Sequence, residues 1–219
     1  MAMGSILAMG GFPLLPLLEH VLALAGRRLL YVGTAGMEDA KTALDFQQAL
    51  RGSVEEFTVV RFYPWPPNDL RELVLGHDVV FVPGGNTANM LAIWRVHGFD
   101  RLLREAWEEG ALLCGVSAGA ICWFEAGVTD SFGPQLEGMR DGLGFLAGSA
   151  CPHYDGEELR RPVYRRLVEE GFPPGVAIDD GAAVLYRGTE LAEVLTCRDG
   201  ATAYRVAREG EVALTARWP

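Results

Sequence analysis

Ser117 lies at the centre of "GVSAG" (residues 115–119), a Gly-x-Ser-x-Gly pattern that follows an apolar run. In this pattern a strand leads through a sharp turn into a helix, and the small flanking residues let neighbouring backbone approach the turn. The turn exposes the serine hydroxyl, which can then act as a nucleophile. A serine before a helix can also be an ordinary N-cap. The predicted strand before Ser117 and the predicted helix after it favour the nucleophile.

A serine nucleophile needs a general base, and histidine is the usual one. The chain has four histidines. His20 lies in the middle of a predicted helix, His77 at a turn before a strand, and His97 at the end of a helix. His153 follows the strand-like segment "GSACP", at the edge of the predicted sheet where ligands bind. His153 is therefore the candidate base.

The imidazole of the base needs a carboxylate that orients it. Asp180 follows the predicted strand "GVAI" by two residues and precedes a glycine, so it can lie at the same edge of the sheet. Asp179 is the immediate rival, because adjacent residues that leave a strand point to opposite sides. Asp130 and Asp155 are further rivals, and spacing alone does not choose among the four.

An oxyanion hole needs two N–H donors. The amide of Ala118, directly after the candidate nucleophile, is the natural first donor. The segment "PGGNT" offers Gly84 and Gly85, which lack side chains and let the backbone approach a substrate carbonyl. A phosphate-binding loop is the alternative use of these glycines, but neither GxGxxG nor GxxxxGK[ST] occurs in the chain.

Alternating strands and helices would position these residues. The predicted strands cover 5–11, 28–35, 56–64, 78–85 and 111–116, and the predicted helices cover 14–26, 38–52, 70–76, 86–98, 100–110 and 118–127. The runs "LLYVG", "DVVFVPGG" and "ALLCGV" are continuously apolar, which is typical of strands buried on both faces. The pattern predicts an α/β fold with a mostly parallel sheet and helices on both faces. From residue 181 onward, short β-rich segments separated by Gly or Asp predict antiparallel strands added at the C-terminal edge.

The composition restricts the size and the partners of the protein. A chain of 219 residues with 49% hydrophobic content fits one domain over 1–219, in which residues 1–5 are interpreted as a cloning remnant. The net charge of −10 repels phosphate backbones, so nucleic acid is not an expected partner. The apolar N-terminus has no basic start and is interrupted by Gly and Pro, so we expect neither a signal peptide nor a membrane span. The four cysteines form no CxxC pair and have no zinc-ligand spacing, which predicts reduced thiols, a cytoplasmic protein and no metal.

Four segments in order, "VPGGNT", "GVSAGAICWF", "CPHYDG" and "AIDDGAAV", resemble the peptidase E and cyanophycinase family of serine hydrolases. The resemblance runs from about residue 5 to the C-terminus. It implies a fold like that of the class I glutamine amidotransferases, with serine where those enzymes place cysteine. It implies no cofactor.

The resemblance also implies a role for each matched residue. Ser117 matches the nucleophile, His153 the base and Asp180 the acid, while Gly85 matches the glycine of the oxyanion hole. The acid is glutamate in peptidase E and cyanophycinase, so Asp180 is a departure. Because aspartate is one methylene shorter, either the His153 loop sits closer to it or the contact is weaker.

Peptidase E removes an N-terminal aspartate from short peptides, and an arginine shortly after the histidine binds its carboxylate. In this sequence Arg160 and Arg161 of "GEELRRP" are the candidates for that role, and Asn86 is a further candidate for substrate binding. The segment is shorter than in the family, and Glu157 and Glu158 compete for the guanidinium groups. We therefore expect weaker activity on Asp-X dipeptides than the family resemblance suggests.

Together, the residues and the resemblance predict a serine hydrolase, a dipeptidase that acts on small peptides through a Ser-His-Asp triad. Two alternatives stay open: a non-peptidase amidase or acyl-transfer enzyme, and a binding protein with weak turnover on the same scaffold. The sequence also leaves a homodimer open.

Overall fold

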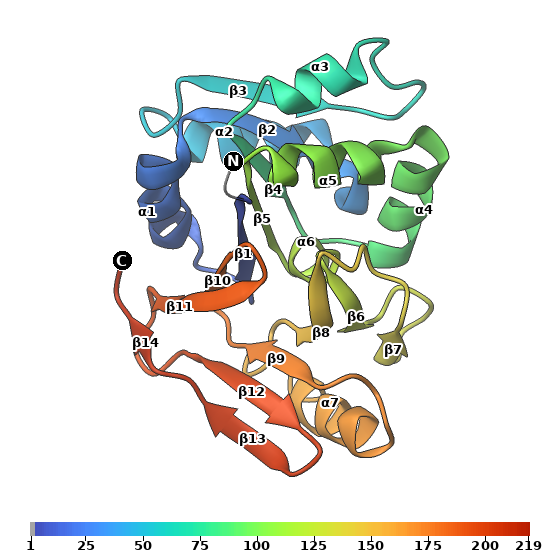
Figure 1. The fold of residues 1–219 in the computed structure, drawn as a ribbon, viewed down its shortest axis with the longest axis vertical. Helices are drawn as coiled ribbons and strands as arrows, with labels where there is room; N and C mark the ends of the chain where they lie inside the picture. The colour runs from blue at the N-terminus through green and yellow to red at the C-terminus, as the bar shows by residue number, and fades with distance from the viewer. Residues whose placement is uncertain (1–2) are drawn as a thin grey trace.

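The computed structural model describes residues 3–219, which form two sheets and their covering helices (Figure 1). The strands are β1 (Ser5–Met9), β2 (Arg28–Val32), β3 (Glu56–Val60), β4 (Val79–Val82), β5 (Leu112–Val116), β6 (Phe124–Thr129), β7 (Glu137–Met139), β8 (Leu146–Cys151), β9 (Gly175–Ile178), β10 (Ala182–Arg187), β11 (Glu190–Thr196), β12 (Ala203–Ala207), β13 (Gly210–Ala213) and β14 (Ala216–Arg217). The helices are α1 (Leu15–Ala25), the 3-10 helix η1 (Gly33–Gly36), α2 (Ala40–Ala49), α3 (Leu70–Leu75), α4 (Thr87–His97), α5 (Phe99–Glu108), α6 (Ala118–Ile121) and α7 (Arg160–Glu169).

The first sheet has the strand order β14-β11-β10-β1-β5-β4-β2-β3. Its strands β1 to β5 are all parallel, as the continuous apolar runs predicted. Every residue of β4 and β5 is buried, because helices cover the sheet on both faces. The carboxyl ends of β1, β4 and β5 therefore meet at one edge of this sheet.

The two faces of the first sheet follow the period of two along each strand. On β1, Leu7 and Met9 pack in a cluster with α1 and α2. Ile6 and Ala8 point to the other face and pack in a cluster with α3, α4, α5 and α6. The predicted sheet with helices on both faces is thus confirmed.

The second sheet has the strand order β13-β12-β9-β8-β6-β7 and lies beside the first (Figure 1). Phe124 of β6 and Ile178 of β9 join the cluster on the α4–α6 side of the first sheet, so one core continues across both sheets. The opposite face of the second sheet packs against α7, where Tyr164 and Val168 share a buried cluster with Cys151 of β8.

The strands after residue 181 are divided between the two sheets, which refines the predicted arrangement at one edge. β10 pairs antiparallel with β1, and β11 pairs antiparallel with β10, as expected. β12 leaves this sheet and pairs antiparallel with β9, and β13 continues from it. The division follows from burial, since Val206 of β12 is fully buried in the cluster against α7.

The predicted helix over 118–127 is wrong beyond its first turn. α6 ends at Ile121, and β6 begins at Phe124. β6 pairs with β8 through Gly127 and Ala150, and a side chain at Gly127 would collide with Ile121. The pairing of β6 with β8 has overridden the local helical pattern. This pairing is not visible in the sequence of the segment alone.

Of the residues interpreted as a cloning remnant, the structure describes 3–5. Met1 and Ala2 lie outside the described residues. The amide of Gly4 donates to the carbonyl oxygen of Trp107 at 2.7 Å, and Ser5 begins β1. Within residues 3–219, no helix has both the length and the apolar character needed to cross a bilayer.

The turn between β5 and α6 depends on close backbone packing. A Cβ at Gly119 would overlap the carbonyl oxygen of Val82 in β4, and a Cβ at Gly115 would overlap the carbonyl oxygen of Gly119. The small residues around Ser117 are therefore needed because α6 begins directly against the sheet.

Gly119→Ala should destabilise the fold by about 3 kcal/mol, because the added methyl group meets backbone that cannot move independently. Chemical denaturation of the purified variant measures this loss. Gly133→Ala is the matched control, since the nearest atom to its added Cβ would be Oε1 of Gln135 at 3.7 Å. Equal stability of the two variants would contradict the close packing at Gly119.

Candidate active site

Ser117 has the backbone conformation of a strained turn, with φ 58° and ψ −114°. Residues other than glycine occupy positive φ rarely, and such strain gathers at functional sites. The Ser117 carbonyl oxygen accepts hydrogen bonds from the amides of Ala120 and Ile121 and so begins α6. The Ser117 side chain, however, makes no capping hydrogen bond to the helix. Its hydroxyl group is therefore not used as an N-cap.

His153 and Asp180 are joined by a hydrogen bond of 2.7 Å between Nδ1 and Oδ1. His153 follows β8 and also has a positive φ, 55°, while Asp180 lies in the short connection between β9 and β10. Both side chains are largely covered, with 20% and 28% of their surface exposed. A carboxylate on Nδ1 fixes the tautomer and leaves Nε2 free to accept a proton.

Two glycines make room for the Asp180 carboxylate. A Cβ at Gly11 would overlap Oδ1 of Asp180 and lie 2.7 Å from Nδ1 of His153. A Cβ at Gly156 would overlap Oδ2 of Asp180. Neither glycine is among the site residues predicted from the sequence, although "GG" at the end of the first predicted strand and the glycine of "HYDG" are signals for them.

Asp155, one of the rival carboxylates, holds the backbone of Asp180 instead of the ring. Its Oδ1 accepts a hydrogen bond from the Asp180 amide at 2.9 Å, and its Oδ2 pairs with Arg198. The Nε of Arg198 donates to the carbonyl oxygen of Asp180 at 2.8 Å. Asp155 and Arg198 therefore hydrogen-bond to the two peptide groups that flank the Asp180 Cα atom.

The other two rivals point elsewhere. Asp179 is only 2% exposed, and its Oδ2 accepts a hydrogen bond from the amide of Thr202. Burial raises the pKa of Asp179 to about 6. Asp130 is exposed after the end of β6. Of the four carboxylates, Asp180 is the one that hydrogen-bonds to His153.

Ser117 and His153 line the same cavity, which has a volume of about 310 Å³. No hydrogen bond joins their side chains in the part of the chain that the structure describes. Catalytic hydrogen bonds often tighten only when a substrate binds, so the shared cavity is the relevant observation.

The loop after β4 lies beside Ser117, where an oxyanion hole would be. A Cβ at Gly84 would lie 3.2 Å from Cβ of Ser117, and one at Gly85, which has φ 140°, would overlap the carbonyl oxygen of Ala35. Within residues 3–219, the amides of Gly85 and Ala118 donate to no acceptor. Both N–H groups therefore stay candidates for the oxyanion hole.

The three residues expected to bind substrate are occupied by other contacts. Asn86 caps α4 through its Oδ1, which accepts from the amide of Asn89, and its Nδ2 donates to the carbonyl oxygen of Ser131. Arg160 is 3% exposed, with Nε donating to Glu157 and a terminal nitrogen donating to the carbonyl oxygen of Val128.

Arg161 pairs with Glu211, and its guanidinium group lies over the rings of Tyr154 and Tyr204. Neither Arg160 nor Arg161 lines the cavity of Ser117. Glu157 and the carbonyl oxygen of Val128 bind Arg160, and Glu211 binds Arg161, so the structure places neither guanidinium group in this cavity.

The buried cysteines do not compete with Ser117 as nucleophiles. Cys114 and Cys122 are fully buried, and burial raises the pKa of both thiols well above the usual range. The thiolate is the reactive form of cysteine, and these side chains stay protonated.

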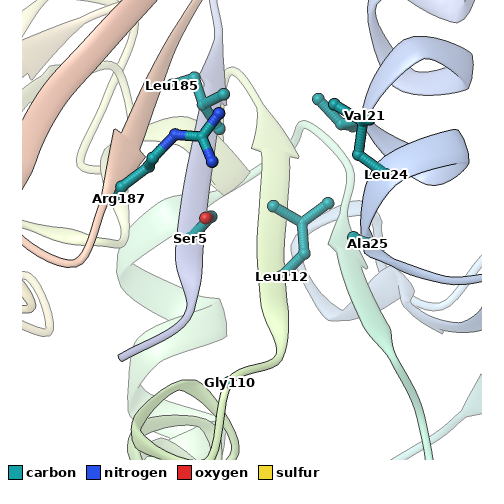
Figure 2. Close-up of a pocket in the computed structure, with 8 residues that line it drawn as sticks. All are labelled: Ser5, Val21, Leu24, Ala25, Gly110, Leu112, Leu185 and Arg187. Atoms are coloured by element: carbon teal, nitrogen blue, oxygen red, sulfur yellow. The ribbon is translucent and has the colours of Figure 1, made fainter. Parts of the chain in front are cut away.

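A second cavity of about 270 Å³ lies at the opposite edge of the first sheet, where β1 and β5 begin (Figure 2). Figure 2 shows Leu185 and Arg187 of β10 on one side of it and Val21 and Leu24 of α1 on the other. Its lining contains no histidine, so it does not combine a nucleophile with a base.

Comparisons with known proteins identify the family of the chain. The family model described as "Peptidase family S51" matches residues 4–194. A relative from Bacillus subtilis (strain 168), "Uncharacterized peptidase YgaJ", is 52% identical over 142 residues, which span 64% of this chain and 61% of that protein. "Peptidase E" from Shewanella denitrificans is 26% identical over 170 residues, 74% of this chain and 70% of that protein.

Two solved structures share the fold. A peptidase from an acI-B1 Actinobacterium aligns with a TM-score of 0.71 and 19% identity, over 98% of this chain and 95% of the other. A putative peptidase E protein from Listeria monocytogenes EGD-e aligns with a TM-score of 0.62 and 20% identity, over 90% and 100%. The predicted peptidase E-like, class I glutamine amidotransferase-like fold is thus confirmed.

Gly11→Ala should break the hydrogen bond between His153 and Asp180, because the methyl group takes the space of Oδ1. In proton NMR spectra, the downfield signal of the Nδ1 proton should disappear from the variant. Gly133→Ala should retain the signal. Its persistence in Gly11→Ala would show that the carboxylate has another way to reach the ring.

Asp179→Asn should change the pH dependence of stability. The raised pKa of Asp179, about 6 against 3.8, means that the folded state holds this proton more tightly than the unfolded state. Stability is therefore lost as the pH rises from about 4 to about 6, and the loss is complete above pH 6. The free energy of unfolding of the variant minus that of wild type should be about 1.5 kcal/mol larger at pH 8 than at pH 5.

Urea unfolding at the two pH values measures this difference. Asp130→Asn, which changes an exposed carboxylate, should show no such difference. An equal effect of Asp179→Asn at both pH values would mean that Asp179 does not titrate in this range.

Proposed function

We propose that this chain, which belongs to peptidase family S51, hydrolyses short peptides with Ser117, His153 and Asp180 as its catalytic triad. The observation that carries the triad is the 2.7 Å hydrogen bond between His153 and Asp180, next to a cavity that His153 shares with Ser117. The substitution of aspartate for the family's glutamate is compatible with this role, since Gly11 and Gly156 let the shorter side chain reach the ring.

In the proposed mechanism, Oγ of Ser117 attacks the scissile carbonyl carbon while Nε2 of His153 takes the hydroxyl proton. Asp180 accepts the hydrogen bond from Nδ1 and stabilises the imidazolium that forms. The amides of Gly85 and Ala118 donate to the carbonyl oxygen as it becomes negative.

The tetrahedral intermediate then collapses. His153 gives its proton to the leaving amine, the C–N bond breaks, and an ester with Ser117 remains. A water molecule attacks this ester, and its proton passes to His153. The acid product leaves when the bond to Oγ of Ser117 breaks and the proton returns to the serine.

The choice of short peptides rests on two supports. The Shewanella relative is named peptidase E. The cavity beside Ser117, at about 310 Å³, is at the lower end of the range for small-molecule sites, so it holds a small part of a ligand.

Ser117→Ala should lower kcat on any cleaved dipeptide by at least about 10³-fold, and Asp180→Asn should also lower it strongly, since an amide stabilises imidazolium poorly. Asp130→Asn is the control and should keep wild-type kcat. Liberation of amino acids from a dipeptide panel gives the rates, and circular dichroism checks the fold.

Labelling by a fluorophosphonate tests the nucleophile without any assumption about the substrate. Wild type should be labelled on Ser117, and Ser117→Ala should not. Full activity of Ser117→Ala, or labelling of another residue alone, would remove Ser117 from the mechanism.

A further inference from the structure

The cavity that holds Ser117 and His153 is lined mainly by carbon. Its wall is formed by Phe12 and Leu14 before α1, Tyr31 of β2, Phe46 of α2, Phe81 of β4 and Val116 of β5. Leu14, Tyr31, Phe81 and Val116 belong to the buried cluster on the α1 and α2 face of the first sheet, and Phe46 packs against it. Phe12 is exposed at the rim of the wall. The cavity therefore continues from the candidate nucleophile into an apolar layer.

Three aromatic rings of this wall pack against one another. The rings of Phe46 and Phe81 stack with 4.3 Å between their centroids, and Tyr31 lies 5.5 Å from Phe46 and 6.0 Å from Phe81. Mutual packing of the rings keeps the cavity in a defined shape. Aromatic faces and edges are good contacts for another apolar or aromatic group.

The cavity lacks a lysine or arginine that could bind a carboxylate. Its lining residues with polar side chains are Ser117, His153, Thr42 and Tyr31. Burial raises the pKa of Tyr31 to about 12, so the phenol stays neutral, and the Thr42 hydroxyl already donates to Asp39 at 2.6 Å.

An acidic substrate side chain would therefore lose its water in this cavity without gaining a charged partner. Arg160 and Arg161 were the residues predicted from the sequence to bind a carboxylate. They pair with Glu157 and Glu211 and do not line the cavity. Desolvation of an unpaired carboxylate is strongly unfavourable, whereas an apolar side chain gains from the same burial.

We propose that this cavity is a specificity subsite that accepts an apolar side chain, with phenylalanine or leucine preferred, from a residue next to the scissile bond. The subsite rests on the proposed function, because it places the substrate relative to Ser117. The enzyme is accordingly selective for apolar dipeptides and discriminates against aspartyl ones.

The first test compares kcat/KM of the full-length protein on X-Ala and Ala-X dipeptides, where X is Phe, Leu, Ala, Asp or Lys. At one of the two positions, Phe and Leu should exceed Ala by tenfold or more, and Asp should fall below Ala. If dipeptides are cleaved, a preference for Asp at either position, or no preference for Phe or Leu at both, would overturn the subsite.

The second test narrows the cavity from α2. Thr42 lines it, whereas Leu44, two residues further along the same helix, is exposed and does not. Thr42→Trp should lower kcat/KM for the preferred Phe dipeptide by at least tenfold and that for Ala-Ala by less than threefold. Leu44→Trp should leave both values at wild type. An equal loss on both dipeptides in Thr42→Trp would count against the subsite.

A binding experiment separates failure of the subsite from failure of the proposed function. In Ser117→Ala, saturation-transfer NMR should detect N-acetyl-phenylalaninamide but not N-acetyl-aspartamide, and adding Thr42→Trp should remove the signal. If no dipeptide is cleaved and this pattern holds, the proposed function is wrong and the subsite stands. If neither amide binds, or the aspartyl amide binds as well, the subsite is wrong.

Discussion

The candidate site depends on how closely backbone segments approach one another at the carboxyl edge of the first sheet. Gly119 lets α6 begin against Val82, which gives Ser117 its strained turn. Gly11 and Gly156 leave the space that the Asp180 carboxylate occupies beside His153. At each of these three glycines the required property is the absence of a Cβ atom, so any other residue would fill the space. The chemistry assigned to Ser, His and Asp is thus possible only because nearby residues contribute backbone alone.

Local sequence patterns predicted the parallel sheet and the turn at Ser117, because the buried strands are continuously apolar and the Gly-x-Ser-x-Gly spacing is short. The same patterns predicted that His153 and Asp180 lie at the carboxyl edge of the sheet, as Ser117 does. They did not separate Asp180 from Asp155, since this choice depends on Arg198, which arrives from a distant turn and fixes Asp155 on the Asp180 backbone.

Contacts between distant segments also explain why some features could not be predicted from the sequence. Phe124 begins a strand and not the middle of a helix, because β8 offers it a pairing partner. Arg160 and Arg161 suit a carboxylate-binding role by residue type, yet Glu157 and Glu211 already satisfy them. The apolar cavity was missed for the same reason, since its aromatic residues come from β2, α2 and β4.

The three proposed catalytic residues do not belong to one sheet. Ser117 follows β5 of the first sheet, His153 follows β8 of the second, and Asp180 lies where the chain crosses from β9 to β10, from the second sheet to the first. Catalytic geometry tolerates errors of well under 1 Å. The alignment of Ser117 with His153 therefore depends on how firmly the two sheets pack on their common core. If the packing between the two sheets loosened slightly, the proposed hydrolysis would stop while both sheets stayed folded. The rate of hydrolysis is therefore a more sensitive measure of tertiary order in this protein than its secondary-structure content is.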